Sequence, residues 1–351
     1  MEFLENVALA PYTTFKIGGP ARWFAEAASE AEVLEGVEFA RERGLQLFVL
    51  GGGSNLLVSD EGFGGLVLRL GLLGIKRRFE EDCLHFEVGA GEGWDEFVSL
   101  AVAEDCAGIE CLAGIPGTVG GTPVQNVGAY GQEVAETVVG VRALDLRSRE
   151  FVWMPVEECG FAYRQSLFNT TERGRYVVTQ VEYSLTPGGA ATLTYADLKK
   201  HFEGWDRVPS LREVAGAVRE IRRTKGMFLV EGDPDCRSAG SFFKNPVVDL
   251  GVLAAIEASM PEASMPAGVA VPRYPAGDGK VKLAAAWLLE QAGFGKGFGK
   301  GRAGISSRHT LALVNRGGAT AGEILELSGR IVAGVETRFG VRLEREPVLL
   351  Q

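Results

Sequence analysis

The fold is decided by two glycine-rich stretches, LGGGSNLL at 50–57 and GIPGTVGGTPVQNVGAYG at 114–131. The chain has 48 glycines among 351 residues, about twice the share of an average protein, and they concentrate between Gly51 and Gly131. The first stretch follows the apolar run LQLFVL at 45–50, which is typical of a buried strand. Because successive bare N–H groups after a strand form an anion-binding concavity, GGGSN predicts a phosphate-binding loop rather than a simple turn.

The second stretch is a long loop of unusual composition. It has no helical or strand period, and a loop of this length inside a compact domain is usually functional or disordered. Its apolar residues argue against disorder. Gln125 and Asn126 add side-chain amides to its backbone donors, as Ser54 and Asn55 add polar groups to the first loop. Two such loops suggest a large ligand with a diphosphate, and a dinucleotide such as FAD fits.

The rest of the pattern indicates an α+β or mixed α/β fold. Capping boxes at Ser29–Glu32 and Thr320–Glu323 open helices that end near Gly44 and Gly340. Composition changes past Gly226, which places a domain boundary near residue 223. We further expect helices at 94–108 and 211–225, strands at 45–50, 84–88 and 341–350, and several short strands within 138–185.

Charge, cysteines and apolar runs exclude several classes of protein. A formal net charge of −10 gives no attraction to nucleic-acid phosphates. The five cysteines are odd in number and form no CxxC motif, so we expect no disulfide scaffold and no metal site. The N-terminal segment lacks the features of a signal peptide, and the most apolar run, Gly64–Ile75, is too short to span a membrane. We therefore expect a cytoplasmic protein with no nucleic-acid or membrane partner.

Motifs for other chemistries are weak. Gly299, Gly301 and Gly304 form a GxGxxG pattern, but no strand precedes it, and outside a strand–loop–helix unit the pattern does not indicate a dinucleotide site. We interpret this segment as a flexible basic loop. The three histidines carry no metal motif, and no G-x-S-x-G elbow supports hydrolase chemistry.

Seven stretches, dispersed over nearly the full length, carry a family likeness. They are TFKIGG (14–19), LGGGSNLL (50–57), GIPGTVGGTPVQNVGAYG (114–131), YRQSLF (163–168), GSFFKNP (240–246), KLAAAWLLEQAG (282–293) and LEREP (343–347). In content and order they resemble the UDP-N-acetylenolpyruvoylglucosamine reductases, flavoenzymes of peptidoglycan precursor synthesis. The YRQS segment is similar to the subgroup with an extended loop over the substrate.

The resemblance implies an α+β fold with a two-lobed FAD-binding part of the vanillyl-alcohol-oxidase type and a C-terminal α+β substrate domain. The domains it predicts are residues 1–70, joined by a terminal strand at 341–351, as the first flavin lobe, residues 71–222 as the second lobe, and residues 223–340 as the substrate-binding domain. It implies an enzyme in which NADPH reduces FAD, and FAD then reduces the enolpyruvyl ether of UDP-N-acetylglucosamine. We expect only small-molecule partners, and a monomer.

The resemblance also assigns roles to residues at matching positions. Ser241 is implied as the proton donor, with Arg164 and Glu346 polarising the substrate carboxyl region. The residues implied to hold the sugar or diphosphate are Tyr195, Lys225, Asn245 and Gln291. The residues implied to hold FAD are Leu50, Gly51, Gly52, Gly53, Ser54, Asn55, Ile115, Pro116, Gly117, Gly120, Gly121, Gln125, Asn126, Gly128 and Ala129.

Three features of the chain bear on these assignments. The basic segment 211–225, which ends at Lys225, suits a diphosphate despite the acidic net charge. Pro347 follows Glu346 where the family usually has valine, and Glu344 would face the same side of a strand, so Glu344 is the alternative carboxylate. The stretch Pro261–Pro275 is longer than the resemblance leads us to expect.

Two other functions compete with the reductase. An oxidase of the same fold on another substrate would explain the flavin loops, but not the GSFFKNP box together with Lys225 and Glu346. A non-enzymatic protein that binds a flavin or a sugar nucleotide would keep the loops and would not need Ser241.

Overall fold

The computed structural model describes residues 1–259, 271–277 and 279–351. Its chain divides into two compact units: unit 1 comprises Met1–Ala8, Pro20–Gly53 and Gly62–Thr224, and unit 2 comprises Leu9–Gly19, Ser54–Glu61 and Lys225–Gln351. The chain therefore leaves unit 1 inside the GGGSN loop, between Gly53 and Ser54. Most of the Pro261–Pro275 stretch lies outside the described residues, and the three-part domain division stays a prediction.

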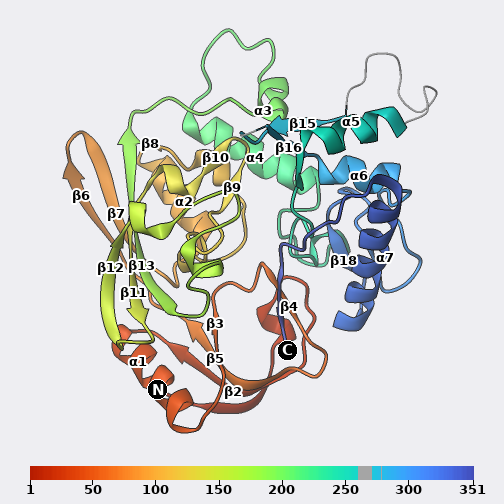
Figure 1. The fold of residues 1–351 in the computed structure, drawn as a ribbon. Coiled ribbons are helices and arrows are strands. Elements are labelled where there is room, and N and C mark those ends of the chain that lie inside the picture. The colour runs from red at the N-terminus through yellow and green to blue at the C-terminus, as the bar shows by residue number, and fades with distance from the viewer. Residues whose placement is uncertain (260–270, 278) are drawn as a thin grey trace. The chain divides into compact units, whose positions relative to one another are not determined.

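The first sheet of unit 1 has the strand order β1-β2-β5-β3, and its strands β2, β5 and β3 are labelled in Figure 1. Its strands are β1 (Leu4–Ala8), β2 (Pro20–Ala27), β5 (Phe63–Leu70) and β3 (Leu47–Leu50), and β5 runs parallel to both β2 and β3. Helix α1 (Glu30–Glu42) begins after Ser29, whose hydroxyl accepts the Glu32 N–H as predicted. The buried residues of α1 share a hydrophobic core with Leu66 and Leu68 of β5.

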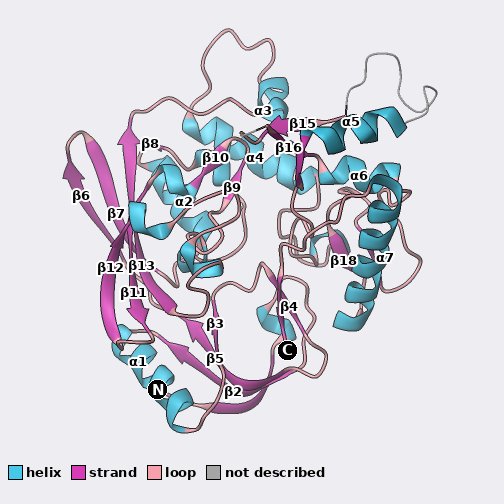
Figure 2. Cartoon of the chain, in the orientation of Figure 1, coloured by secondary structure: helices cyan, strands magenta, loops and turns pink. Residues whose placement is uncertain are grey.

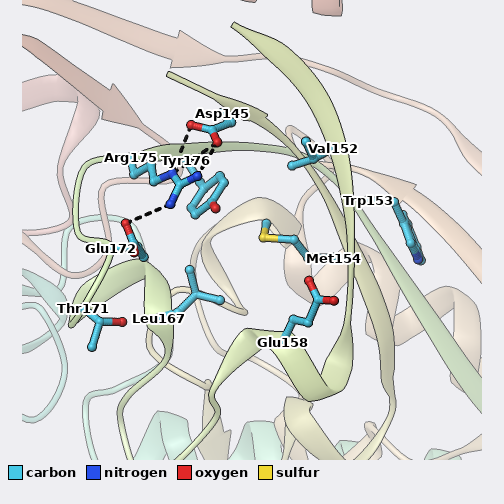
Figure 3. Close-up of a pocket in the computed structure, with 10 residues that line it drawn as sticks. All are labelled: Asp145, Val152, Trp153, Met154, Glu158, Leu167, Thr171, Glu172, Arg175 and Tyr176. Atoms are coloured by element: carbon cyan, nitrogen blue, oxygen red, sulfur yellow. Dashed lines mark hydrogen bonds and ion pairs between the residues drawn. The ribbon is translucent and has the colours of Figure 1, made fainter. Parts of the chain in front are cut away.

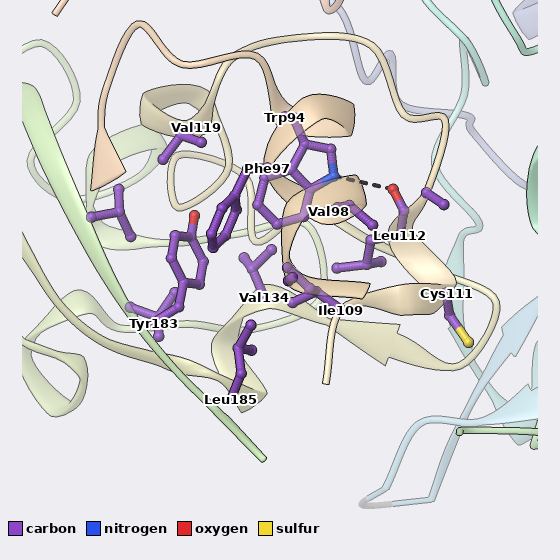
Figure 4. Close-up of a cluster of buried hydrophobic side chains, with 14 of the residues drawn as sticks. Trp94, Phe97, Val98, Ile109, Cys111, Leu112, Val119, Val134, Tyr183 and Leu185 are labelled. Carbon is purple, nitrogen blue, oxygen red and sulfur yellow. Dashed lines mark hydrogen bonds between the residues drawn. The ribbon is translucent and has the colours of Figure 1, made fainter. Parts of the chain in front are cut away.

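The second sheet of unit 1 is antiparallel, with the order β12-β11-β13-β7-β6 and with β8 paired to β13. Its strands are β6 (Ile75–Glu80), β7 (Cys83–Gly89), β8 (Cys106–Ala107), β11 (Val138–Asp145), β12 (Glu150–Pro155) and β13 (Tyr176–Pro187). Helix α2 (Trp94–Ala103) buries Trp94 and Phe97 against Tyr183 of β13 (Figure 4). The Trp94 indole donates to the carbonyl of Leu112 at 3.1 Å, which ties α2 to the segment that leads into the 114–131 loop.

Three short elements complete the part of unit 1 that matters for the site. The hairpin of β9 (Gly128–Ala129) and β10 (Gln132–Glu133) closes the 114–131 loop. Helices α3 (Ala196–His201) and α4 (Leu211–Thr224) follow the second sheet in the chain. Short 3-10 helices in the two units are η1 (Ala10–Tyr12), η2 (Glu110–Leu112), η3 (Val119–Gly121), η4 (Val134–Glu136), η5 (Val156–Cys159), η6 (Leu167–Asn169) and η7 (Pro234–Cys236).

Unit 2 combines small sheets with helices (Figure 2). Its strands are β4 (Leu56–Val58) parallel to β19 (Val348–Leu350), the antiparallel set β14 (Val247–Asp249), β16 (Lys280–Leu283) and β15 (Arg273–Pro275), and the hairpin of β17 (Ala303–Ile305) and β18 (Leu313–Asn315). Its helices are α5 (Leu250–Ser259), α6 (Ala285–Gln291) and α7 (Ala321–Phe339). Ile324, Ile331 and Val335 of α7 are fully buried in the core of this unit.

Most of the expected elements are present. Helix α7 has the predicted capping box at Thr320 and ends at Gly340 in the left-handed conformation. The terminal strand is shorter than predicted, since 341–350 contains only an isolated bridge from Arg345 to Phe243 and then β19. Pro347, which cannot donate to a ladder, stands where the chain changes from one partner to the other. Within the described ranges, no helix is long and apolar enough to cross a membrane.

Candidate active site

The two glycine loops meet inside unit 1. A Cβ added to Gly52 would lie 2.5 Å from the Cα of Gly117, and one added to Gly51 would lie 2.8 Å from the Thr118 hydroxyl oxygen. Contacts this short with backbone do not occur, so the bare Cα of Gly52 is required for the loops to approach each other. The first loop thus packs on the second, as two neighbouring walls of one site would.

Several donors at this meeting point have no partner in the protein. Across residues 1–259, 271–277 and 279–351, nothing accepts the backbone N–H groups of Gly52, Gly53, Gly117 or Thr118. The Thr118 hydroxyl is also buried and without a hydrogen-bond partner there. Because a buried polar group without a partner is costly, the Thr118 hydroxyl in particular calls for an acceptor, and the unpaired N–H groups beside it fit an acceptor-rich ligand such as a diphosphate. Thr118 was not among the residues predicted from the sequence.

Other predicted donors of the second loop are used inside the protein. The N–H of Gly120 donates to the Ala90 carbonyl at 2.9 Å, and the N–H of Gly121 donates to the Thr118 carbonyl at 3.0 Å. The Asn126 side chain donates to Glu133 and to the Ala162 carbonyl and accepts the Ala135 N–H. These groups stabilise the loop itself. Fewer of its N–H groups are therefore free to bind a ligand than the number of glycines suggests.

The start of the second loop is held by charged side chains. The Gly114 N–H donates to Asp95 Oδ1 at 2.6 Å, and the Gly114 carbonyl accepts from Arg222 Nε at 2.9 Å. Arg219 of α4 completes the arrangement through a bidentate pair with Asp95, in which Nε donates to Oδ2 at 3.1 Å and Nη2 donates to Oδ1 at 2.7 Å. Two of the basic residues expected to serve a diphosphate are therefore engaged with unit 1 itself, because they hold Gly114.

Arg164 lies against the end of the same loop. Its Nη2 donates to the Gly128 carbonyl at 2.6 Å, and its guanidinium carbon lies 5.2 Å from the centre of the Tyr163 ring. Its backbone has φ of +55°, a conformation that costs a non-glycine residue energy and is common at functional sites. Tyr195 also lies beside the 114–131 loop, with its ring centre 5.3 Å from the ring centre of Tyr130.

In unit 2, backbone pairing between two segments brings Ser241, the predicted proton donor, close to Glu346, the predicted carboxylate. The Glu346 N–H donates to the carbonyl of Phe242, the residue after Ser241, at 2.9 Å. Phe242 and Phe243 are each 1% exposed, so two buried rings fix the backbone beside Ser241. Ser241 and Glu346 thus lie on adjacent segments of one unit, although 105 positions separate them in sequence.

The same pairing separates the two candidate carboxylates. Glu344 lies opposite Lys244, whose backbone N–H donates to the Glu344 carbonyl at 3.0 Å. The Glu344 side chain is 79% exposed and only 3.9 Å from the Lys244 ammonium. Glu346 is half-buried next to Ser241. Glu346 is thus the less exposed of the two carboxylates and the one that lies beside Ser241.

The second half of the GGGSN loop belongs to this part of unit 2. Asn55 Nδ2 donates to the Glu346 carbonyl at 3.4 Å, and the Asn55 carbonyl accepts the Val348 N–H at 3.0 Å. The Thr14 hydroxyl donates to the Ser238 carbonyl at 2.6 Å, which anchors the segment before Ser241. The Phe15 and Phe242 rings also meet edge to face, with centroids 6.3 Å apart, so the TFKIGG and GSFFKNP stretches are in direct contact.

The predicted substrate residues of unit 2 are spread over two elements. Asn245 Oδ1 accepts the Ala285 N–H at 2.9 Å, so Asn245 holds the start of α6, which ends at Gln291. Lys225 stands at the beginning of the unit's long segment and is half-buried. Asn245 and Gln291 are thus linked through one helix, whereas Lys225 is not part of it.

Comparison with known proteins identifies the family. Residues 233–350 match the family model described as "UDP-N-acetylenolpyruvoylglucosamine reductase, C-terminal domain", and residues 21–152 match an FAD binding domain. A UDP-N-acetylenolpyruvoylglucosamine reductase from Thermobifida fusca (strain YX) is 46% identical over 99% of this chain and 98% of its own. The chain belongs to the UDP-N-acetylenolpyruvoylglucosamine reductase family.

Similarity to further reductases supports the family assignment. One from Streptomyces coelicolor (strain ATCC BAA-471 / A3(2) / M145) is 46% identical over 98% of this chain and 89% of its own. The crystal structure of the reductase from Thermus caldophilus is 27% identical, covers 100% of this chain and 98% of its own, and superposes with a TM-score of 0.65. The α+β class and the FAD-binding fold predicted from the sequence are therefore confirmed.

In this member of the reductase family, backbone carbonyls in and around the GxGxxG segment accept hydrogen bonds from an arginine. Arg316 donates to the carbonyls of Gly297, Phe298 and Ile305 at 3.0, 3.2 and 3.0 Å, and to that of Gly299. A Cβ on Gly304 would lie 2.2 Å from the Arg316 guanidinium carbon. The segment wraps around a side chain of its own unit, which accounts for the glycine at position 304.

A pocket outside the predicted site lies in unit 1. It has a volume of about 500 Å³ and is lined by ten residues between Asp145 and Tyr176, none of them a predicted site residue (Figure 3). The five cysteines are free thiols, as expected, and burial raises the pKa of Cys159 to about 12. In the described part of the chain, no cluster of three or more His, Cys, Asp or Glu side chains could hold a metal ion.

Proposed function

We propose that this chain is an FAD-dependent reductase that uses NADPH to convert the enolpyruvyl ether of UDP-N-acetylglucosamine to UDP-N-acetylmuramate, a step of peptidoglycan precursor synthesis. The observation that carries the proposal is the meeting of two glycine loops that leave four backbone donors and the Thr118 hydroxyl without protein partners. Family membership favours the reductase over an oxidase of the same fold or a non-enzymatic binding protein.

The FAD diphosphate would be held by the loop residues whose donors are unpaired. Gly52, Gly53 and Gly117 offer backbone N–H groups, and Thr118 offers its N–H and its hydroxyl. Donors of this kind stabilise a diphosphate without a counter-ion. The remaining predicted loop residues, with Gly120, Gly121 and Asn126 among them, support the cradle from within. FAD supplies the hydride chemistry when it is bound.

The protein's own part in the reaction is to manage charge and a proton. Reduction of an enolpyruvyl group leaves negative charge next to its carboxylate, and preorganised donors lower the cost of that charge. Arg164 and Glu346 are proposed to polarise this region, with Glu346 carrying a proton. Ser241 is proposed to donate a proton to the substrate carbon. A serine hydroxyl is a weak acid, so it needs such neighbours to act.

The substrate's sugar and diphosphate are proposed to contact Tyr195, Lys225, Asn245 and Gln291. We propose residues 1–70 with 341–351, and 71–222, as the flavin lobes, and 223–340 as the substrate domain. We also propose a cytoplasmic location and a monomer, which gel filtration of the purified protein would test. A mass near 37.5 kDa supports the monomer, and twice that mass excludes it.

The function is tested by spectroscopy and turnover on the purified protein. A bound flavin gives a yellow protein, and continued NADPH turnover, beyond the amount that reduces the bound flavin, should require the enolpyruvyl ether of UDP-N-acetylglucosamine. UDP-N-acetylglucosamine, which lacks the enolpyruvyl group, is the matched control and should support no turnover. A colourless protein that consumes no NADPH with the enolpyruvyl substrate contradicts the proposal.

A further inference from the structure

Glu110, in the short helix η2, is a fully buried carboxylate that no step of the proposed reaction uses. It is 0% exposed. Its Oε1 accepts the Thr192 N–H at 2.8 Å and the Gln132 Nε2–H at 2.9 Å, and its Oε2 accepts the Gly108 N–H at 2.9 Å. Across the described ranges, no Arg or Lys forms an ion pair with it. Burying a carboxylate is costly unless hydrogen bonds satisfy it, and here three N–H donors do so.

The segment that Glu110 holds has no regular structure of its own. Residues 189–194 are neither helix nor strand. Thr192 is fixed on three sides: its N–H by Glu110, its carbonyl by the Cys111 thiol at 3.3 Å, and its hydroxyl by Gln132 at 3.2 Å. The position of this segment therefore depends on side chains of η2 and β10 rather than on a ladder.

Gln132 links the same cluster to the end of the 114–131 loop. Its Oε1 accepts the Cys111 N–H at 2.8 Å, and its strand β10 pairs with Ala129 of the loop. The contact continues along the chain, since a Cβ on Gly131 would lie 2.1 Å from the Thr194 hydroxyl oxygen. The ring of Tyr195 then lies 5.3 Å from that of Tyr130. Glu110 thus joins the end of one glycine loop to the segment that presents Tyr195.

We propose that Glu110 is a positioning residue, which holds residues 189–195 against the end of the 114–131 loop and so sets where Tyr195 meets the anionic substrate. Glu110 does not touch the substrate, because it is fully buried. The inference rests on the proposed function in one respect, the contact of Tyr195 with the substrate. A carboxylate suits this task because one group can accept from three chain segments at once.

The variant that tests the inference is Glu110→Gln. The amide nearly keeps the size of the side chain, but its NH2 group faces donors and only one oxygen still accepts. The matched control is Glu182→Gln. Glu182 is a buried glutamate of the same unit, 5% exposed, and its carboxylate accepts from Arg78 at 2.6 Å and from no donor of the Thr192 cluster. Gln132→Met is a second variant that removes a donor to Glu110 and leaves the carboxylate.

Three measurements are made on each flavin-loaded protein. Hydrogen exchange of the 189–195 amides should quicken by at least about tenfold in Glu110→Gln and Gln132→Met, and stay unchanged in Glu182→Gln. The dissociation constant of UDP, by calorimetry, should rise by about tenfold in the first two variants only. Reduction of the flavin by NADPH should stay within about threefold of wild type in all of them, because the loop donors are not altered.

The inference is overturned if exchange in 189–195 and UDP affinity are both unchanged in Glu110→Gln. It is overturned equally if Glu182→Gln reproduces the effects, or if the flavin is lost, because Glu110 then supports the unit as a whole. The proposed function fails differently: wild-type protein would not oxidise NADPH with the enolpyruvyl substrate. The exchange measurement needs no activity, so it still supports or contradicts the positioning role in that case.

Discussion

Gly52 and Gly117 approach so closely that a single added carbon does not fit between them, since a Cβ on Gly52 would lie 2.5 Å from the Gly117 Cα. The obstacle is backbone rather than the end of a flexible side chain, so neither loop can yield without moving its donors. The two glycine loops of unit 1 are therefore one structure, and the unpaired N–H groups on both depend on that contact.

Gly52→Ala should weaken flavin binding strongly. Forced separation of the loops costs about 1–3 kcal/mol, as overpacking usually does, and misplaces the donors. The measurement is the flavin content of the purified protein together with the dissociation constant of added FAD. Gly64→Ala is the control, because a Cβ there meets nothing within 4 Å. Equal flavin affinity in Gly52→Ala and wild type would contradict the role of the contact.

Asp95→Asn should loosen the start of the second loop. Asp95 accepts from Arg219 and from the Gly114 N–H, and the loss of a charged hydrogen-bond partner costs about 1–3 kcal/mol. We expect a lower unfolding free energy in urea and a weaker affinity for FAD. Glu26→Gln breaks an exposed pair with Arg69 and should cost less than about 1 kcal/mol. If both variants lose the same amount, Asp95 has no special role.

Glu346→Gln and Glu344→Gln distinguish the two candidate carboxylates. If protonated Glu346 polarises the substrate carboxyl region, its loss should lower kcat by about 10²–10⁴-fold and leave NADPH-dependent flavin reduction intact. The exposed Glu344 should tolerate the change. The measurement is rapid-mixing kinetics of the two half-reactions, and a large loss confined to Glu344→Gln would reverse the assignment.

The ion pair between Asp145 and Arg175 makes a contribution to the free energy of unfolding that depends on pH. The hydrogen bonds from Arg175, which include one of 2.6 Å, lower the pKa of Asp145 below its ordinary value of 3.8 (Figure 3). A carboxylate with a lowered pKa stabilises the fold above its unfolded-state pKa, and the contribution disappears as the pH falls through the folded-state value.

Asp145→Asn should therefore lower the unfolding free energy at pH 7 by about 1–3 kcal/mol. The difference from wild type should shrink as the pH falls below 3.8 and through the lowered folded-state pKa, because wild-type Asp145 then loses its charge. Urea unfolding at a series of pH values measures this. A difference that does not change with pH would show that the lost packing, and not the charge, is responsible.

Local signals in the sequence predicted local structure well. The caps at Ser29 and Thr320 lie where the S-x-x-E and T-x-x-E patterns predicted them, because a cap depends on residues three positions apart. The GxGxxG at 299–304 was interpreted as a loop because no strand precedes it in the sequence. Its actual partner, Arg316, could not be deduced from the pattern, because any nearby donor could have filled the same turn.

Contacts between residues far apart in the chain could not be predicted from the sequence. Glu110 carries no motif, and its importance appears only once Thr192, 82 positions away, is seen to donate to it. Thr118 looks like any loop threonine until its hydroxyl is found buried without a partner. The terminal strand was predicted too long because its two partners, Phe243 and β4, are chosen by tertiary packing and not by its own residues.

The central claim is most directly tested by anaerobic stopped-flow measurement of the two half-reactions in wild type and in Ser241→Ala. NADPH should bleach the flavin at similar rates in both proteins. Addition of the enolpyruvyl ether of UDP-N-acetylglucosamine should then restore the oxidised spectrum rapidly in wild type, and slower by about 10²-fold or more in Ser241→Ala. If the substrate restores the oxidised spectrum equally fast in both, Ser241 is not the proton donor. If it fails to do so in wild type, the chain is not the reductase proposed here.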